Sequence, residues 1–150
     1  MTEKTNAVIN DFIRITERIA NGKTNRLDFG SPNMTFYRGE IHILKMMGDY
    51  PGIFISEIAR SFNITRAVVA KTVGKLEERG YLTKEEDPRD KKRLRLFLTD
   101  KGREAYRLHE EYHLEYDRPF FDYLEGLNER ELETIQAFLR HAGKVVENHF

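Results

Sequence analysis

Hydrophobic residues recur every three or four positions along most of the chain, and this period predicts a mainly helical protein. One such stripe runs through residues 2–21 and a second through residues 35–47, where Thr35 is the expected N-cap. Residues 22–33 lie between the two stripes and contain Gly, Asn, Ser and Pro, so they predict a loop. The second helix is expected to bury four side chains, those of Phe36, Ile41, Leu44 and Met47.

The next two helical stripes lie very close together in the sequence. They span residues 56–62 and 65–79, and only a tight turn fits between them. The hydroxyl of Thr65 can cap the second helix. We expect Phe62 on the first helix and Val68 on the second to be buried with the apolar faces. This spacing predicts a helix-turn-helix.

A β-hairpin is predicted directly after these helices. Gly80 is the expected C-terminal cap of the second helix, residues 81–86 predict one strand, and residues 94–98 predict another. The segment 87–93 between them carries four positive and two negative charges around one proline, which indicates a charged tip. A hairpin in this position is a wing.

The rest of the chain predicts two more helices. Thr99 can cap a helix that runs to about residue 124, with a kink or break at Pro119. Asn128 and Glu131 form the expected capping box of the last helix. The fold class is therefore mainly α with a small β-hairpin wing, in a single chain over residues 1–150.

The composition of the chain excludes several classes of protein and site. Cysteine is absent, which excludes disulfides, thiolate zinc sites and thiol redox sensing. No apolar run reaches the ~18 residues that cross a bilayer, and residues 1–11 do not resemble a signal peptide, so we expect a soluble, cytoplasmic protein without a membrane partner. Enzymatic motifs are missing as well: there is no glycine-rich phosphate loop and no Gly-x-Ser-x-Gly elbow, and we expect no catalytic activity.

The net charge of zero hides two blocks of opposite sign. Residues 60–95 contain eleven Lys and Arg against six Asp and Glu, whereas residues 104–133 contain ten Asp and Glu against three Arg. A basic block beside an acidic one suggests a surface that faces a polyanion, because attraction to phosphates is local. Ordinary solvated charge on helices is the alternative.

The helix over residues 65–79 and the hairpin are the candidate DNA-binding elements. Small residues on this helix would let its backbone approach a major groove, while its cations could contact phosphates or guanine edges. The helix candidates are Thr65, Arg66, Ala67, Ala70, Lys71 and Lys75. The wing candidates for a minor groove are Arg89, Asp90, Lys92 and Arg93, with Asp90 expected to orient a neighbour. A winged helix that docks a protein and does not bind DNA is the alternative of another class.

Several short motifs resemble the MarR (multiple-antibiotic-resistance regulator) family of winged helix-turn-helix regulators. They are Ile58-Ala59, Ile64-Thr65, Leu76-Glu-Glu-Arg-Gly-Tyr81, Asp87-Pro-Arg-Asp90 and Leu98-Thr-Asp-Lys-Gly102. The resemblance implies a winged helix-turn-helix over residues 35–99, with recognition helix 65–79 and wing 81–98. It also implies dimerisation through residues 1–33 and 100–150.

The same resemblance implies a homodimeric transcriptional regulator, typically a repressor, on a pseudo-palindromic double-stranded DNA operator. A small ligand often lowers DNA affinity in the family, and no cofactor is expected. The family usually has an arginine in the wing where this chain has Lys92, and lysine lacks the planar fork of donors.

Three histidines form the remaining constellation. His109 and His113 are one helical turn apart, Asp117 extends the same face, and His42 lies in the second helix. In zinc-sensing relatives of the MarR family, histidines in similar positions bind metal. A metal-responsive regulator that uses His42, His109 and His113 is therefore an alternative. These histidines could instead line an effector cavity or form hydrogen bonds within a dimer.

Overall fold

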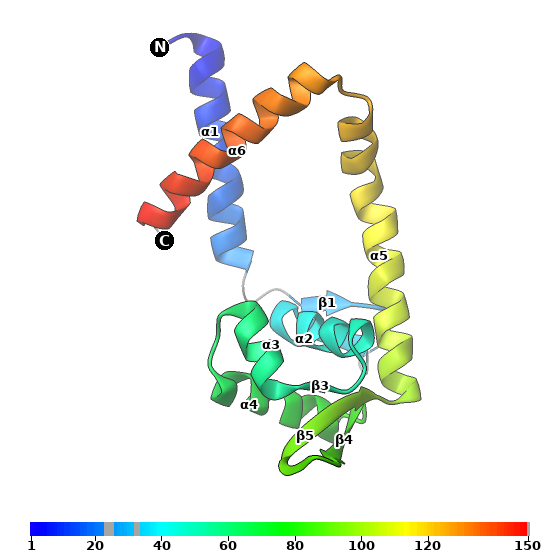
Figure 1. Ribbon diagram of the computed structural model, residues 1–150. Helices are drawn as coiled ribbons and strands as arrows, with labels where there is room; N and C mark the ends of the chain where they lie inside the picture. Colours follow the sequence, from blue (N-terminus) through cyan, green and yellow to red (C-terminus); the bar gives the residue numbers. More distant parts are fainter. Residues whose placement is uncertain (23–25, 32–33, 150) are drawn as a thin grey trace. The chain divides into compact units, whose positions relative to one another are not determined.

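The computed structural model describes residues 1–22, 26–31 and 34–149, and the chain forms two compact units, residues 1–109 and 110–150. In the first unit, the helices are α1 (Glu3–Asn21), α2 (Arg38–Asp49), α3 (Ile55–Phe62) and α4 (Arg66–Glu78) (Figure 1). The strands are β1 (Arg26–Asp28), β2 (Thr35–Tyr37), β3 (Ile53–Phe54), β4 (Leu82–Asp87) and β5 (Asp90–Leu98). Helix α5 (Asp100–Glu125) begins in the first unit and continues into the second, which also contains α6 (Glu129–His149).

Two small antiparallel sheets accompany the helices of the first unit. Strands β1 and β2 form one sheet, and the other has the order β3-β5-β4. The long hairpin of β4 and β5 is the predicted wing, with Leu82 opposite Leu98 at its base. The sequence did not predict β3, whose two residues pair with the middle of β5 and so attach the wing to the start of α3.

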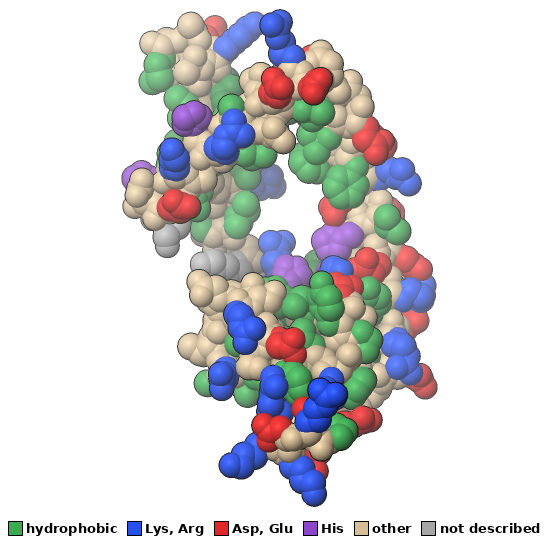
Figure 2. All heavy atoms as spheres, viewed as in Figure 1, with side chains coloured by type: hydrophobic (Ala, Val, Ile, Leu, Met, Phe, Trp, Pro, Cys, Tyr) green, Lys and Arg blue, Asp and Glu red, His purple; other side chains and the backbone are tan. Residues whose placement is uncertain are grey.

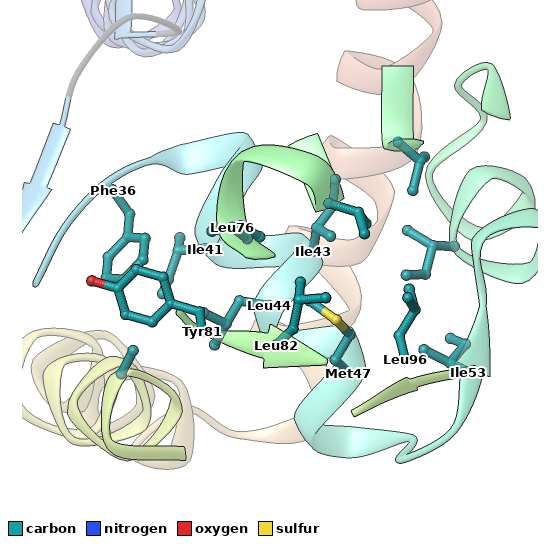
Figure 3. Packing of buried hydrophobic residues seen from close by; sticks show 14 of the residues in the cluster. Phe36, Ile41, Ile43, Leu44, Met47, Ile53, Leu76, Tyr81, Leu82 and Leu96 are labelled. Carbon is teal, nitrogen blue, oxygen red and sulfur yellow. The ribbon is translucent and has the colours of Figure 1, made fainter. Parts of the chain in front are cut away.

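One hydrophobic core joins α2, α3, α4, the first part of α5 and strands of both sheets (Figure 3). It includes the four side chains predicted for the second helix, and all four are at most 1% exposed. Helix α4 contributes Val69, Val73 and Leu76, which are fully buried and lie on one face at helical spacing. Burial of this stripe fixes how α4 is rotated about its own axis.

Several details of the predicted helices need correction. Phe62, the last residue of α3, is 37% exposed. Val68 is 51% exposed, because the buried face of α4 consists of Val69, Val73 and Leu76. Thr35 is not a cap: it lies in β2, and α2 begins only at Arg38, where Glu40 Oε1 accepts from the Tyr37 amide at 2.8 Å.

The predicted loop over residues 22–33 contains β1, which pairs Leu27 with Phe36 and so keeps residues 35–37 extended; residues 23–25 and 32–33 lie outside the described residues. Helix α5 does not break at Pro119 and continues to Glu125.

The predicted helix ends agree well with the structure elsewhere. Gly80 adopts φ +83° directly after α4, in the left-handed region that glycine tolerates. Asn128 Oδ1 accepts from the Glu131 amide and Glu131 Oε2 accepts from the Asn128 amide, both at 2.9 Å, so the capping box is confirmed. None of the helices in the described part of the chain combines the length and apolar character needed to cross a membrane.

The first turn of α5 packs against the backbone that follows α4, and a substitution can test this contact. A Cβ atom at Gly102 would overlap the carbonyl oxygen of Tyr81. We expect Gly102→Ala to lower the free energy of unfolding by about 1 to 3 kcal/mol, measured by urea denaturation.

Gly74→Ala is the matched control, because nothing lies within 4 Å of a Cβ at this helical position. It should leave stability unchanged or raise it by up to about 1 kcal/mol. Equal stability of the two variants would contradict the close packing at Gly102.

Candidate nucleic-acid interface

Helices α3 and α4 form a helix-turn-helix with a very short turn. Asn63 adopts φ 52° and ψ 48°, and this left-handed residue reverses the chain after α3. The Ile64 amide donates to the Ala59 carbonyl at 3.0 Å, and the Thr65 hydroxyl accepts from the Val68 amide at 3.3 Å. The predicted tight turn and the Thr65 cap are therefore confirmed.

The candidates that the sequence placed on α4 and at its N-cap lie outside the buried stripe. Each of them is exposed: Thr65, Arg66, Ala67, Ala70, Lys71 and Lys75. Within the described residues, no carboxylate forms an ion pair with the cations Arg66, Lys71 and Lys75. The helix thus presents cations separated by small residues, which suits close approach to a groove lined by phosphates.

The wing differs from its prediction in the length of its tip. Asp87 pairs with Asp90 across a turn at Pro88 and Arg89, so the second strand begins at Asp90 rather than at residue 94. Lys92 and Arg93 therefore lie on β5 and not in a loop, although both are exposed. The loop at the tip of the wing is therefore shorter than its many charged residues led us to predict.

The exposed residues of the wing differ in their local contacts. Asp90 Oδ1 accepts from the Lys92 amide at 3.1 Å, so its carboxylate contacts a neighbouring residue. The guanidinium of Arg93 lies 3.7 Å from the centre of the Phe54 ring, where it stacks on the protein. Arg89 is exposed in the turn, and Lys92 keeps an exposed side chain on β5.

A buried carboxylate anchors the base of this wing. Asp87 is only 5% exposed, and its Oδ1 accepts from Arg95 Nε at 3.3 Å. Arg95 also donates through Nη1 to the Gly52 carbonyl at 3.3 Å, and its guanidinium lies 4.8 Å from the centre of the Phe54 ring. Asp87 and Arg95 therefore connect the hairpin to the segment before α3.

Arg95 and Phe54 were not predicted from the sequence as parts of the site. Alternation along β5 puts Arg93 and Arg95 on one face of the strand, and this period was available in the sequence. The pairing of β3 with β5, which brings Phe54 opposite Arg95, was not available from local patterns.

The other end of α4 is held by Arg79, which was not predicted from the sequence either. Arg79 Nη2 donates to the Thr35 carbonyl at 2.6 Å, and Nη1 lies 3.6 Å from Glu40 Oε2. Its guanidinium lies about 5 Å from the ring centres of Phe36 and Tyr81. Burial raises the pKa of Tyr81 above its ordinary value of 10.0, although the nearby Arg79 acts in the opposite direction.

The start of α5 caps the same end of α4. Lys101 Nζ donates to the Arg79 carbonyl at 2.7 Å, and the Thr99 hydroxyl donates to the Gly80 carbonyl at 2.6 Å. A lysine at this position also complements the partial negative charge of the helix C-terminus. Helix α4 is thus fixed at its C-terminus by β2, α2 and α5.

The histidines do not assemble the alternative metal site. His109 is 1% exposed and lies with its ring centre 6.1 Å from that of His42 and 6.4 Å from that of Phe29. His113 Nδ1 lies 2.7 Å from Asp117 Oδ2. In residues 1–22, 26–31 and 34–149, no group of three His, Asp or Glu side chains could hold a metal ion.

The basic side chains cluster on one part of the surface. Figure 2 shows Lys and Arg side chains gathered around the end of the first unit that carries β4 and β5. The acid-rich segment 104–133 lies in α5 and α6, away from these elements in sequence. The basic block of residues 60–95 therefore lies on α4, the wing and the end of α3.

Comparison with known proteins gives consistent similarities. A family model described as the MarR family matches residues 37–93, from the start of α2 to β5. The uncharacterized HTH-type transcriptional regulator YybA of Bacillus subtilis is 29% identical over 139 residues, which span 93% of this chain and 91% of YybA. These similarities are to transcriptional regulators and not to enzymes.

Two solved structures have the same fold. FabT of Streptococcus pneumoniae, crystallised in complex with DNA, is 23% identical with a TM-score of 0.64, over 97% of this chain and 94% of FabT. ZitR of Lactococcus lactis, a zinc-responsive MarR family member, is 20% identical with a TM-score of 0.76, over 95% of this chain and 99% of ZitR. The wing and helix-turn-helix described above are thus a shared architecture.

The wing anchor can be tested by removing its carboxylate. Asp87→Ala leaves the partly buried Arg95 without this acceptor, and we expect the free energy of unfolding to fall by about 1 to 3 kcal/mol in urea denaturation. Asp90→Ala is the matched control, because Asp90 is exposed and contacts only a neighbouring amide among the contacts described; its effect should stay below about 0.5 kcal/mol. Similar losses in both variants would contradict the anchoring role of Asp87.

Proposed function

Because residues 37–93 match the MarR family model and the chain is similar to HTH-type transcriptional regulators, we propose that it acts as a homodimeric repressor of that family on a pseudo-palindromic DNA operator. In each subunit, α4 enters a major groove and the wing reaches the adjacent minor groove. The two half-sites are about one duplex turn, or ~34 Å, apart, and the symmetry of the dimer sets the symmetry of the operator.

The observation that carries this proposal is the exposed face of α4. The face combines Arg66, Lys71 and Lys75 with the small side chains of Ala67 and Ala70, which let the helix backbone come close to base edges. Arginine and lysine can contact phosphates, or O6 and N7 of guanine, and the neighbouring wing adds further cations. A surface that binds a polyanion is expected to carry cations at this density.

Dimerisation is supported by apolar side chains that project from the terminal helices. In α1, Val8, Ile15 and Ile19 are more than 50% exposed, although their spacing forms a regular stripe. The second unit exposes further large side chains to the same degree: Leu114, Tyr116, Phe120, Tyr123 and Leu139. Apolar surface of this extent is typical of a protein interface, and a second copy of the chain is the occupant proposed.

A small ligand is proposed to lower the affinity for DNA, as the family resemblance implies. Such a ligand can act only if it binds better to one separation of the two recognition helices than to another. The ligand-bound dimer would then hold its α4 helices at a spacing that does not fit the operator.

Removing two cations from α4 tests the DNA-binding surface. We expect Arg66→Ala combined with Lys71→Ala to weaken binding to a genomic operator fragment by about 100-fold or more, because each side chain contributes roughly 1 to 3 kcal/mol to binding. The slope of log affinity against log salt should also become shallower by about 0.9 for each phosphate that the variant no longer neutralises. Fluorescence anisotropy with labelled duplex measures both quantities.

The matched control is Arg130→Ala combined with Lys144→Ala, which removes the same charge from exposed positions of α6. This control should bind the operator like the unaltered protein. Equal affinity of the two double variants, or no salt-dependent DNA binding at all, would favour the protein-docking alternative.

Dimerisation can be tested independently of DNA. Light scattering after gel filtration should give about 35 kDa, twice the chain mass of 17.7 kDa. Phe120→Asp should shift this mass toward the monomer, because a charge would be buried in the proposed interface. Tyr50→Asp is the control, since Tyr50 is also 61% exposed but lies outside the terminal helices; a monomeric unaltered protein would contradict the proposal.

A further inference from the structure

A recess of about 410 Å³ lies between the wing and the helix-turn-helix. Its walls come from the start of α3, the start of α4 and the first half of β5. Four cations line it, namely Arg60, Arg66, Lys92 and Arg93, together with Ser56 and the Phe54 ring. The described residues that line the recess include no acidic side chain.

The charge of this recess is not neutralised within the chain. No carboxylate in the described residues forms an ion pair with any of the four cations. Cations drawn together from three elements repel one another, so they create a local positive potential that an anion relieves. The recess is therefore suited to a negatively charged group.

The recess also has a fixed wall. The guanidinium of Arg93 stacks on the Phe54 ring, 3.7 Å from the ring centre. The pairing of β3 with β5 holds the two residues in register. Ser56 adds a hydroxyl in the first turn of α3, where backbone amides lack partners within the helix. An anion here would meet guanidinium groups and a hydroxyl together.

The position of the recess identifies the anion. Arg66 is the first residue of α4 and belongs both to the exposed face proposed to enter the major groove and to the wall of the recess. Phosphates border the groove that such a helix enters, so a group bound beside the start of α4 is a backbone phosphate.

We propose that the recess binds one phosphodiester group of the DNA backbone, with Arg60 as a contact that does not depend on base sequence. This inference rests on the proposed function. Arg60 lies outside both the recognition helix and the wing, and its role follows only from the three-dimensional arrangement. A phosphate held here touches α3, α4 and β5 at once, so DNA binding would also fix the wing against the helix-turn-helix.

Arg60→Gln tests this proposal with an operator duplex and an unrelated duplex of equal length. Because a dimer carries two recesses, we expect both affinities to fall by the same factor, roughly five- to tenfold for each subunit, and the salt slope to become shallower by about 1.8, the value for two phosphates. Arg60→Lys should keep part of the affinity, since lysine retains the charge without the planar fork. Arg38→Gln is the matched control, because Arg38 is an exposed arginine at the start of α2 outside the recess, and it should change neither affinity nor slope.

Two results with DNA would overturn the proposal. If Arg60→Gln behaves like Arg38→Gln, no phosphate is bound by Arg60. If Arg60→Gln weakens operator binding much more than binding to the unrelated duplex, Arg60 reads bases rather than the backbone.

A measurement without DNA separates this proposal from the proposed function. Inorganic phosphate is titrated into the full-length protein, and the Nε–H signals of the arginines are followed by NMR. Saturable shifts that include Arg60 and Arg66, and that disappear in Arg60→Gln, support the recess as an anion site even if the protein binds no duplex. Absence of these shifts, combined with normal DNA binding by Arg60→Gln, overturns the recess and leaves the proposed function intact.

Discussion

Burial of one apolar stripe on α4 determines the rest of the reading surface. Val69, Val73 and Leu76 are fully buried, and their spacing leaves only one rotation of the helix that places them all in the core. This rotation turns Arg66, Lys71 and Lys75 toward solvent. The apolar contacts therefore do more than stabilise the domain, because they decide which side chains a partner meets.

The wing depends on a second constraint, the pairing of β5 with both β4 and β3. The contact between Asp87 and Arg95 supports this pairing, and Lys92 and Arg93 remain exposed. A hairpin that was paired only with itself would be marginally stable in water. Attachment through β3 instead makes the cations of the wing and of α3 parts of one rigid surface.

Much of the fold followed from local patterns, and the errors have a common physical origin. The period of apolar residues gave the helices, and Thr65, Gly80 and Asn128 marked their ends correctly. Thr35 was misassigned because its cap-like chemistry is outweighed by pairing with β1, a contact between separate segments. The wing tip was predicted too long, since its charges suggested a loop although Asp87 and Asp90 pair.

The candidate site shows the same division. Exposure of the six α4 candidates could be predicted, because they lie between the apolar positions that form a clear buried stripe. Arg79, Arg95 and Arg60 could not be singled out, since each owes its surroundings to residues distant in sequence.

The direct join between the wing and α5 bears on which operators can be bound. Only Thr99 separates β5 from α5, and its hydroxyl donates to the Gly80 carbonyl, so no loop separates the wing from the first turn of α5. In the proposed dimer, this direct join would favour operators with one fixed half-site spacing.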